Sequence, residues 1–163
     1  MRRIGVISDT HGLLRPEAVE ALRNVELIVH AGDVGNMGIL ERLTELAPVR
    51  AIRGNTDGAG VGPLPDTEVV DLGTADGVVA DPPVGPLAYV LHDLDTLDLD
   101  PAEAGMKVVV SGHTHRPLVE ERGGVLYLNP GSAGPRRFDL PVSVAYLIAE
   151  ADGALRAEIV RLG

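Results

Sequence analysis

Side chains that can bind divalent metal ions recur in this sequence at one kind of place, the end of a short apolar run. Asp9 and His11 follow the first run, and Asp33 follows the second after a glycine. Later runs lead into Gly-Asn-x-Asp, a lone histidine and Gly-His-x-His. The metal-capable side chains at these places are Asp9, His11, Asp33, Asn55, Asp57, His92, His113 and His115. Gathered together, such groups could bind metal ions, which would polarise a bound phosphate and activate water.

The apolar runs themselves are short, mostly β-branched and bounded by glycine or proline, which is typical of β-strands. The early runs are uninterrupted rather than alternating, as in parallel strands that are covered on both faces. We predict strands over residues 4–7, 27–29, 49–52, 69–72, 89–91, 108–110, 125–128, 142–148 and 154–160. Ligands of open α/β sheets bind beyond the carboxyl ends of the strands, so the polar residues after these runs are expected to share one edge.

Helices are predicted between the early strands. Residues 16–24 and 37–47 place their apolar side chains on one face, and prolines at 16 and 48 mark a start and a stop. A shorter helical turn is expected over residues 100–105. Asp152-Gly153 predicts a two-residue hairpin turn between the last two strands. The chain is therefore expected to begin as a βαβαβ unit and to end with antiparallel strands.

Composition and charge narrow the class of protein. The 163 residues suit one domain over residues 1–163, and 45 % apolar residues can form its core. The absence of cysteine excludes disulfides, thiolate metal sites and a cysteine nucleophile. The net charge of −10 argues against duplex nucleic acid as a partner, and an anionic substrate would need a local positive centre such as a metal ion. No run is long enough to span a bilayer, and the first run turns polar too early for a signal peptide, so we predict a soluble cytoplasmic protein without a membrane partner.

The ordered set Asp-x-His, Gly-Asp, Gly-Asn-x-Asp, a strand-terminal histidine and Gly-His-x-His resembles the calcineurin-like metallophosphoesterase superfamily. The small size, the Gly-Asn-x-Asp variant and Asn-Pro-Gly-Ser at residues 129–132 resemble its small bacterial and archaeal phosphodiesterase branch, the YfcE type. The resemblance runs from residue 9 to residue 132. It implies an α/β fold, a four-layer α/β/β/α sandwich of two mixed β-sheets flanked by helices, with a dinuclear metal site at the carboxyl ends of the strands.

The resemblance also implies a ligand set. One divalent ion would be bound by Asp9, His11, Asp33 and His115, and a second by Asp33, Asn55, His92 and His113, with Asp33 bridging the two. Mixed nitrogen and oxygen ligands suit Mn²⁺, with Ni²⁺, Fe²⁺ and Zn²⁺ as alternatives. The implied reaction is hydrolysis of phosphodiester bonds in a small soluble phosphorylated substrate, in which a metal-bridging hydroxide attacks phosphorus in line.

Residues in and around these motifs are expected to act on the substrate. We assign catalytic roles to Asp33, Asn55, Asp57 and His92, and substrate binding to Arg53, Asn55, Arg116 and Ser132. Several of these have a second interpretation: Asp57 as a cap of its loop, the two arginines as surface residues, and the segment that contains Ser132 as an ordinary turn. His30, inside an apolar run, is predicted to be a hydrogen-bonded core residue beside the site.

Two positions depart from the family pattern. Asp93 follows the strand-terminal His92, where the family commonly has glycine, and adds negative charge near the site. Thr56 stands where protein-phosphatase relatives carry a histidine, so a candidate general acid is missing.

Other functions stay open at this stage. A phosphomonoesterase of the same superfamily would use the same residues, whereas a nuclease is disfavoured by the net charge and the lack of basic clusters. A protein-binding scaffold, like the retromer subunit that resembles this family, would have an impaired metal site, but all seven ligand positions are filled here. A metallo-β-lactamase would need a compact His-x-His-x-Asp-His cluster, which the sequence lacks. Association into a homo-oligomer is also left open.

Overall fold

The computed structural model describes residues 1–163 and contains two five-stranded mixed β-sheets. The first sheet consists of β1 (Arg2–Ile7), β2 (Leu27–His30), β3 (Val49–Ala51), β9 (Ser143–Ala149) and β10 (Leu155–Arg161). Its strands lie in the order β10-β9-β1-β2-β3. β1, β2 and β3 are parallel, β9 pairs antiparallel with β1, and β10 pairs antiparallel with β9. The predicted parallel beginning and antiparallel end are confirmed.

The second sheet has its parallel strands in the middle. It consists of β4 (Thr67–Asp71), β5 (Leu87–Leu91), β6 (Val108–Val110), β7 (Leu118–Arg122) and β8 (Val125–Asn129). The order is β4-β5-β6-β8-β7, in which β5, β6 and β8 are parallel and the two edge strands are antiparallel to their neighbours. The three parallel strands present their carboxyl ends at one edge, where the polar segments after residues 91, 110 and 128 begin.

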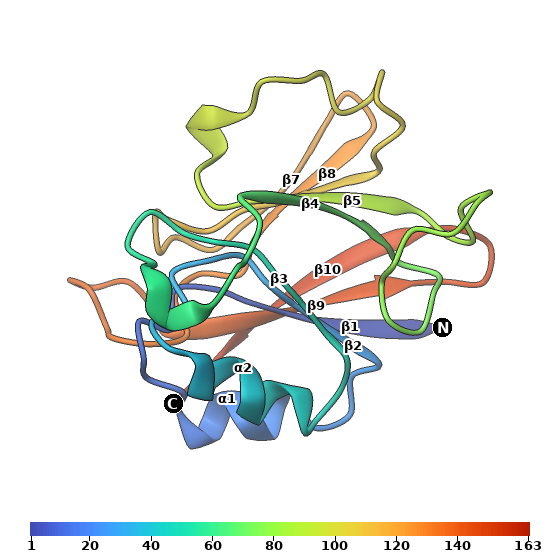
Figure 1. Cartoon of the computed structure of the whole chain (residues 1–163). Helices are drawn as coiled ribbons and strands as arrows, with labels where there is room; N and C mark the ends of the chain where they lie inside the picture. The colour runs from blue at the N-terminus through green and yellow to red at the C-terminus, as the bar shows by residue number, and fades with distance from the viewer.

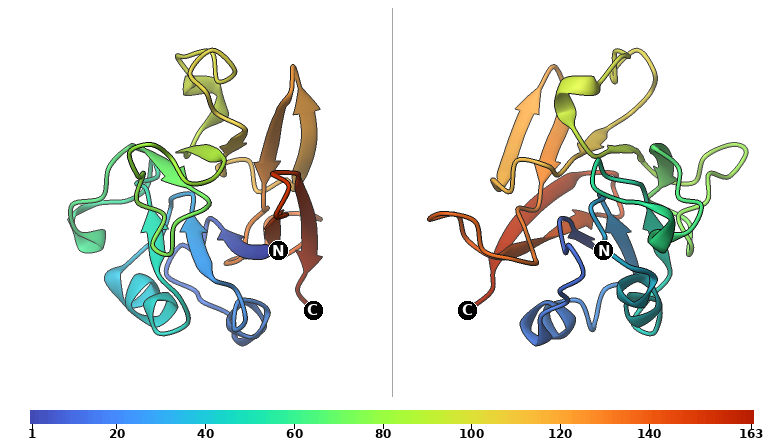
Figure 2. Two further views of the ribbon diagram at one scale, coloured as in Figure 1. Left: turned by 90° about the vertical axis from the view of Figure 1, so that its right-hand side faces the viewer. Right: turned by 60° about the vertical axis from the view of Figure 1, so that its left-hand side comes forward.

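Two short helices, α1 (Pro16–Ala21) and α2 (Met37–Thr44), cover the outer face of the first sheet (Figure 2). Pro16 suits the first turn of α1 because its φ is already helical and its missing N–H would have no partner there. Both helices end three residues earlier than predicted. After α1 the chain leaves helical geometry at Leu22 (φ −96°, ψ 3°), whose buried side chain anchors the turn.

The outer face of the second sheet is covered differently. A 3₁₀ turn, η2 (Leu94–Thr96), and the loop that follows it lie over this face (Figure 1), where Leu94 and Leu97 pack against Leu91, Val109 and Val125. Residues 100–105 form the predicted helical turn, in which the amide of Ala104 donates to the carbonyl of Asp100 (3.0 Å), but the turn does not continue as a helix. The α/β fold class with two mixed sheets and flanking helical layers is confirmed, with the fourth layer reduced to this 3₁₀ turn and loop.

The largest apolar core lies between the two sheets. Ile4, Val29, Val90 and Val108 are among its fully buried members. A second core joins the first sheet to the helices and includes Leu22, Ile28 and Leu43. Both faces of the first sheet are therefore buried, which explains why the runs in β1 and β2 are uninterrupted.

Two features of the strands differ from the prediction. β7 was absent from the apolar runs because it is an edge strand with exposed charged residues, Glu120 to Arg122, and its pairing with β8 is made by backbone groups. The last hairpin has residues 150–154 between β9 and β10 instead of two, with Glu150 and Ala154 hydrogen-bonded across the turn. In addition, no helix is long and apolar enough to cross a membrane.

Candidate metal centre

The predicted site residues meet at the carboxyl ends of the parallel strands of both sheets. Asp9 follows β1, Asp33 follows β2, Asn55 follows β3, His92 follows β5, and His113 follows β6. In Figure 1 the loops after β1, β2 and β3 gather at this end of the molecule, which lies opposite the N-terminus. The site is therefore assembled from two sheets and from segments more than a hundred residues apart in the chain.

One group of possible metal ligands surrounds Asp9. Its Oδ1 atom lies 3.4 Å from His115 Nε2 and 3.7 Å from His11 Nε2. These three residues each offer a ligand atom within reach of one ion. They are three of the four residues that the resemblance assigns to the first ion, and the fourth, Asp33, places its Oδ2 3.6 Å from His11 Nε2.

A second group surrounds Asp33. Its Oδ2 lies 3.1 Å from His92 Nε2, which is itself 3.8 Å from Asp9 Oδ1. Asp9, Asp33 and His92 form the second set of atoms that could bind one ion. Asp33 Oδ2 thus contacts one imidazole from each of the two implied ligand sets, His11 and His92.

Asn55 and His113 lie together at the rim of the cluster. Asn55 Oδ1 is 3.2 Å from His113 Nδ1, and the His113 ring packs edge-on against His92 with ring centres 5.2 Å apart. Adjacent ligand atoms of one ion, each about 2.1 Å from it, lie about 3 Å apart. Both the Asn55–His113 distance and the Asp33–His92 distance match that separation.

The cluster suits a cation because His92 and Asp9 each use one polar atom in hydrogen bonds to the protein and turn the other toward the centre of the cluster. His92 donates its Nδ1–H to the carbonyl of Ala31 (2.7 Å), which leaves Nε2 facing inward. Asp9 accepts hydrogen bonds at Oδ2 from the hydroxyl of Ser8 (2.7 Å) and the backbone of His113 (3.1 Å). Asp9 Oδ1, His11 Nε2 and His92 Nε2 are buried without a hydrogen-bond partner. Buried polar atoms without partners are costly, and divalent ions bound at the two groups would satisfy all three.

Backbone strain is concentrated in the same residues. Six residues other than glycine have φ in the left-handed region, and five of them are Asp9 (57°), His11 (46°), Asp33 (56°), His113 (70°) and His115 (62°). Each such conformation costs of order 1–3 kcal/mol and persists only where the surrounding structure enforces it. The fold therefore holds these five side chains in place against the local preference of the backbone.

Two glycines allow the close approach of the segments that carry the carboxylates. A β-carbon at Gly54 would overlap the backbone and carboxylate of Asp33. A β-carbon at Gly112 would overlap the hydroxyl of Ser8 and lie 2.8 Å from Asp9 Oδ2. Any larger residue would displace a carboxylate from the cluster.

The comparisons with known proteins agree with this geometry. The family model described as the calcineurin-like phosphoesterase superfamily domain matches residues 1–152. The chain belongs to this superfamily. A probable metallophosphoesterase of Methanothermobacter thermautotrophicus is 39 % identical over 171 aligned positions, covering 98 % of this chain and 92 % of that protein.

A further relative and two solved structures extend the likeness. The phosphodiesterase YfcE of Escherichia coli is 30 % identical, with 90 % of this chain and 88 % of YfcE covered, and its crystal structure superposes with a TM-score of 0.65. The crystal structure of Vps29 from Entamoeba histolytica complexed with Zn²⁺ superposes with a TM-score of 0.71 over 99 % of both chains at 20 % identity. The predicted membership and fold are confirmed by these findings.

The electrostatics of this phosphoesterase cluster favour ionised carboxylates. Burial raises the pKa of Asp33, but the close approach of the His92 imidazole and hydrogen bonding with Thr56 outweigh it and hold that pKa well below the usual range. Burial likewise raises the pKa of Asp9, but the nearby His115 imidazole and the hydrogen bond from Ser8 bring it below the usual value. Burial lowers the pKa of His92, whereas its contacts with Asp33 and Ala31 raise it above normal. Two anionic carboxylates beside inward-facing imidazoles are suited to a divalent cation.

His30 is a hydrogen-bonded core residue, as the sequence predicts. Its side chain is fully buried, its Nδ1 accepts a hydrogen bond from the backbone of Gly32 (3.1 Å), and its Nε2 lies 3.0 Å from Thr10 Oγ1. Because Nδ1 accepts a hydrogen bond, the proton of the neutral ring is on Nε2, which donates to Thr10 Oγ1. The Thr10 hydroxyl in turn donates to the carbonyl of Val34 (2.8 Å). The network ties the Asp9 loop to the Asp33 loop.

Three residues that the sequence assigns to catalysis or substrate binding are engaged elsewhere. Asp57 uses both carboxylate oxygens to accept hydrogen bonds from backbone groups of the loops after β2 and β3, which favours the loop-cap interpretation over a catalytic role. The Arg53 guanidinium donates to the carbonyls of residues 57, 58 and 62 within its own loop. The Ser132 hydroxyl is buried and donates to the carbonyl of Asp9, so it supports a cluster residue and is not open to substrate.

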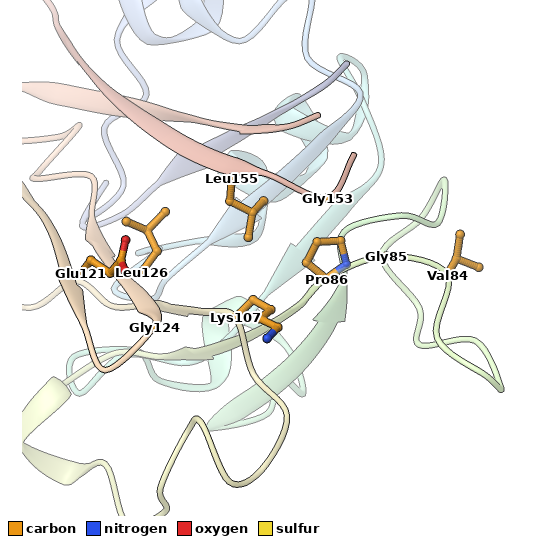
Figure 3. Close-up of a pocket in the computed structure, with 9 residues that line it drawn as sticks. All are labelled: Val84, Gly85, Pro86, Lys107, Glu121, Gly124, Leu126, Gly153 and Leu155. Carbon is orange, nitrogen blue, oxygen red and sulfur yellow. The ribbon is translucent and has the colours of Figure 1, made fainter. Parts of the chain in front are cut away.

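Arg116 is different, because it lines an open pocket beside the cluster. This pocket has a volume of about 360 Å³ and is lined by His113, Thr114, Arg116, Asp93 and Asp95 among others. The larger cavity of about 570 Å³ in Figure 3 lies at the opposite end of the molecule, where β5, β6 and β8 begin, and it contains none of the predicted site residues. Of these two cavities, only the smaller one adjoins the cluster.

Sequence reasoning passed over two hydroxyl residues of the first loop. Ser8 holds Asp9 Oδ2, and Thr10 connects His30 to the loop after β2. Both are fully buried. The sequence does contain a sign of this role, because Ser8 and Thr10 alternate with Asp9 and His11, and hydroxyl groups next to metal-binding residues often orient those residues.

Proposed function

We propose that this protein is a dinuclear metal-dependent phosphodiesterase that acts on small phosphorylated compounds. The observation that carries the proposal is the convergence of backbone-strained ligand candidates, Asp9, His11, Asp33 and His115, on one cluster in which Asp9 Oδ1, His11 Nε2 and His92 Nε2 are buried without a partner. Membership of the calcineurin-like phosphoesterase superfamily supplies the class of reaction.

In this proposal the ligand sets are those that the sequence implies. Asp9, His11 and His115 would hold one ion, Asn55, His92 and His113 would hold the other, and Asp33 would contribute to both. The contacts of Asp33 Oδ2 with His92 (3.1 Å) and His11 (3.6 Å) support the bridging role. Asp9 Oδ1 also faces both groups, so the two carboxylates lie between the imidazoles of the cluster.

The ions, when bound, would supply Lewis-acid stabilisation of the phosphoryl oxygens and lower the pKa of water. The chain's own residues position them and the substrate. Two carboxylates against two divalent cations leave a formal excess of positive charge, which attracts a phosphate to an otherwise acidic protein. Arg116 lines the adjoining pocket, which supports a role in binding the phosphate or its ester group.

No side chain at the cluster offers an obvious general acid for the leaving oxygen. Thr56 is exposed, and its backbone N–H donates to Asp33 Oδ1 (2.9 Å), so it acts as a support for the carboxylate. A threonine hydroxyl does not titrate near neutral pH, which points to substrates whose leaving groups are already weakly basic. We further propose that residues 1–163 act as one domain in the cytoplasm, with manganese as the working metal.

A protein-binding scaffold is the second candidate, and the likeness to Vps29 favours it. The two proposals differ in what they require of the cluster. A scaffold needs no turnover, whereas an enzyme needs every ligand position, and all seven are filled in this chain.

The decisive experiment is hydrolysis of aryl phosphodiesters and monoesters by purified protein reconstituted with defined metals. We expect turnover of bis(p-nitrophenyl) phosphate to exceed that of p-nitrophenyl phosphate, to vanish in excess chelator, and to return with Mn²⁺ more fully than with Mg²⁺, which prefers oxygen ligands. Metal binding without turnover of any ester would favour the scaffold. Full activity in chelator, with no metal by elemental analysis, would contradict the proposal.

A further inference from the structure

Asp93 departs from the family pattern, and the structure places its carboxylate beside a candidate metal ligand from a neighbouring strand. Asp93 directly follows His92 at the end of β5, and His113 lies just beyond the end of β6, the parallel neighbour of β5. The backbone of Gly112 donates to the carbonyl of His92 (2.9 Å), which locks the two strand ends together. Asp93 Oδ2 consequently lies 3.8 Å from His113 Nε2.

The two ring nitrogens of His113 face different partners. In this structure the Nδ1–H group donates to Asn55 Oδ1 (3.2 Å), and Nε2 lies 3.8 Å from Asp93 Oδ2, beyond hydrogen-bond distance. A neutral imidazole carries one proton, so His113 can present a lone pair to an ion at Nδ1 only when that proton is on Nε2. A carboxylate near Nε2 favours this arrangement and also strengthens the ring as a ligand.

The other oxygen of Asp93 is already used. Oδ1 accepts a hydrogen bond from the backbone of Asp95 (3.0 Å) and so caps the 3₁₀ turn η2. This cap fixes the side chain with Oδ2 turned to His113. Asp95, in the same turn, makes no contact with His113 and lines the same pocket, so it offers a matched comparison.

We propose that Asp93 is a positioning residue of the metal centre, which stabilises the Nε2–H tautomer of His113 against the hydrogen bond to Asn55 and so frees Nδ1 for the second metal ion. This inference rests on the proposed function, because it takes His113 to be a metal ligand. Both side chains are partly exposed, 34 % for Asp93 and 41 % for His113, so solvent weakens the interaction. The expected effect is at the lower end of the 10–100-fold range typical for partners of metal-ligating histidines.

The test compares Asp93→Asn with Asp95→Asn in the full-length protein. Asparagine can still cap η2, so Asp93→Asn removes the charge beside His113 and leaves the turn intact. Binding of Mn²⁺ is measured by titration calorimetry at one fixed pH. We expect the wild type to bind two ions, Asp93→Asn to bind one of them about tenfold more weakly, and Asp95→Asn to stay within about twofold of the wild type.

A second readout does not depend on metal. Long-range ¹H–¹⁵N spectra of the metal-free protein report the tautomer of each histidine, and we expect Asp93→Asn to move His113 toward the Nδ1–H form while His30 stays Nε2–H. If the wild type binds two ions and Asp93→Asn binds both equally well with an unchanged His113 tautomer, the positioning role is refuted and the proposed function stands. If the wild type binds no second ion, both are refuted.

Discussion

The protonation of His30 offers a test of how tightly the cluster's supporting network is built. Full burial is the largest cause that lowers the pKa of this imidazole, from 6.5 to about 4, although the charges of Asp9 and Asp57 partly oppose it. The unfolded chain therefore binds a proton between these two pH values that the native protein does not. The free energy of unfolding must then fall as the pH falls from 6.5 toward 4.

The size of this effect follows from the two pKa values. Between pH 7.5 and pH 5.0 the protonation of His30 in the unfolded state alone should remove about 2 kcal/mol of stability, rising to about 3 kcal/mol below pH 4. His30→Gln cannot bind that proton. It loses hydrogen bonds to Gly32 and Thr10, so at pH 7.5 it should be less stable than the wild type by about 1–3 kcal/mol. The difference between the two proteins should therefore shrink by about 2 kcal/mol at pH 5.0.

The assay is urea unfolding followed by far-ultraviolet circular dichroism, since the chain has no tryptophan. Both proteins are measured in chelator, where no metal competes with protons for the cluster. His92 has a raised pKa and so stabilises the native state as the pH falls, but it is present in both proteins and cancels in the comparison. If the wild type and His30→Gln lost equal stability between pH 7.5 and 5.0, the conclusion that His30 stays neutral in the native protein would be wrong.

Other predictions concern the cluster itself. Asp33→Asn removes one of only two anionic ligand candidates and should lower kcat by at least about 10³-fold at saturating metal. His30→Gln should lower kcat by only about 10–100-fold. Equal losses in the two variants would show that Asp33 is wrongly assigned as the ligand shared by both ions. Gly112→Ala introduces a methyl group against Ser8 and Asp9 and should weaken Mn²⁺ binding by calorimetry and cost about 1–3 kcal/mol in urea unfolding; an alanine variant with normal metal affinity would refute the close-approach argument. Wild-type rates on substituted phenyl diesters should depend steeply on the leaving-group pKa, and Thr56→His should flatten that dependence; a flat wild-type series would reveal another general acid.

The sequence alone determined the chemistry of the site and the order of its elements. The types of the ligand residues and their position after apolar runs can be read from short stretches of sequence. A β-branched run forms a strand that other elements bury, and the polar residues that follow it lie beyond the end of the sheet. The parallel start, the antiparallel end and the core function of His30 followed from the same patterns. Features without a hydrophobic signal could not be predicted, such as the edge strand β7, whose exposed residues give no apolar pattern and whose pairing depends on backbone groups of β8.

Only the tertiary structure decided how the site residues divide their work. Asp57, Arg53 and Ser132 carry groups that suit catalysis or phosphate binding, yet loop geometry turns them to backbone partners. A residue type states which bonds a side chain can make, but the nearest unsatisfied donor or acceptor determines which ones it makes. The pairing of β5 with β6 likewise brings Asp93 to His113, two residues that nothing in the linear order connects. Contacts between strand ends depend on sheet order and register, and these are set by the packing of the whole chain.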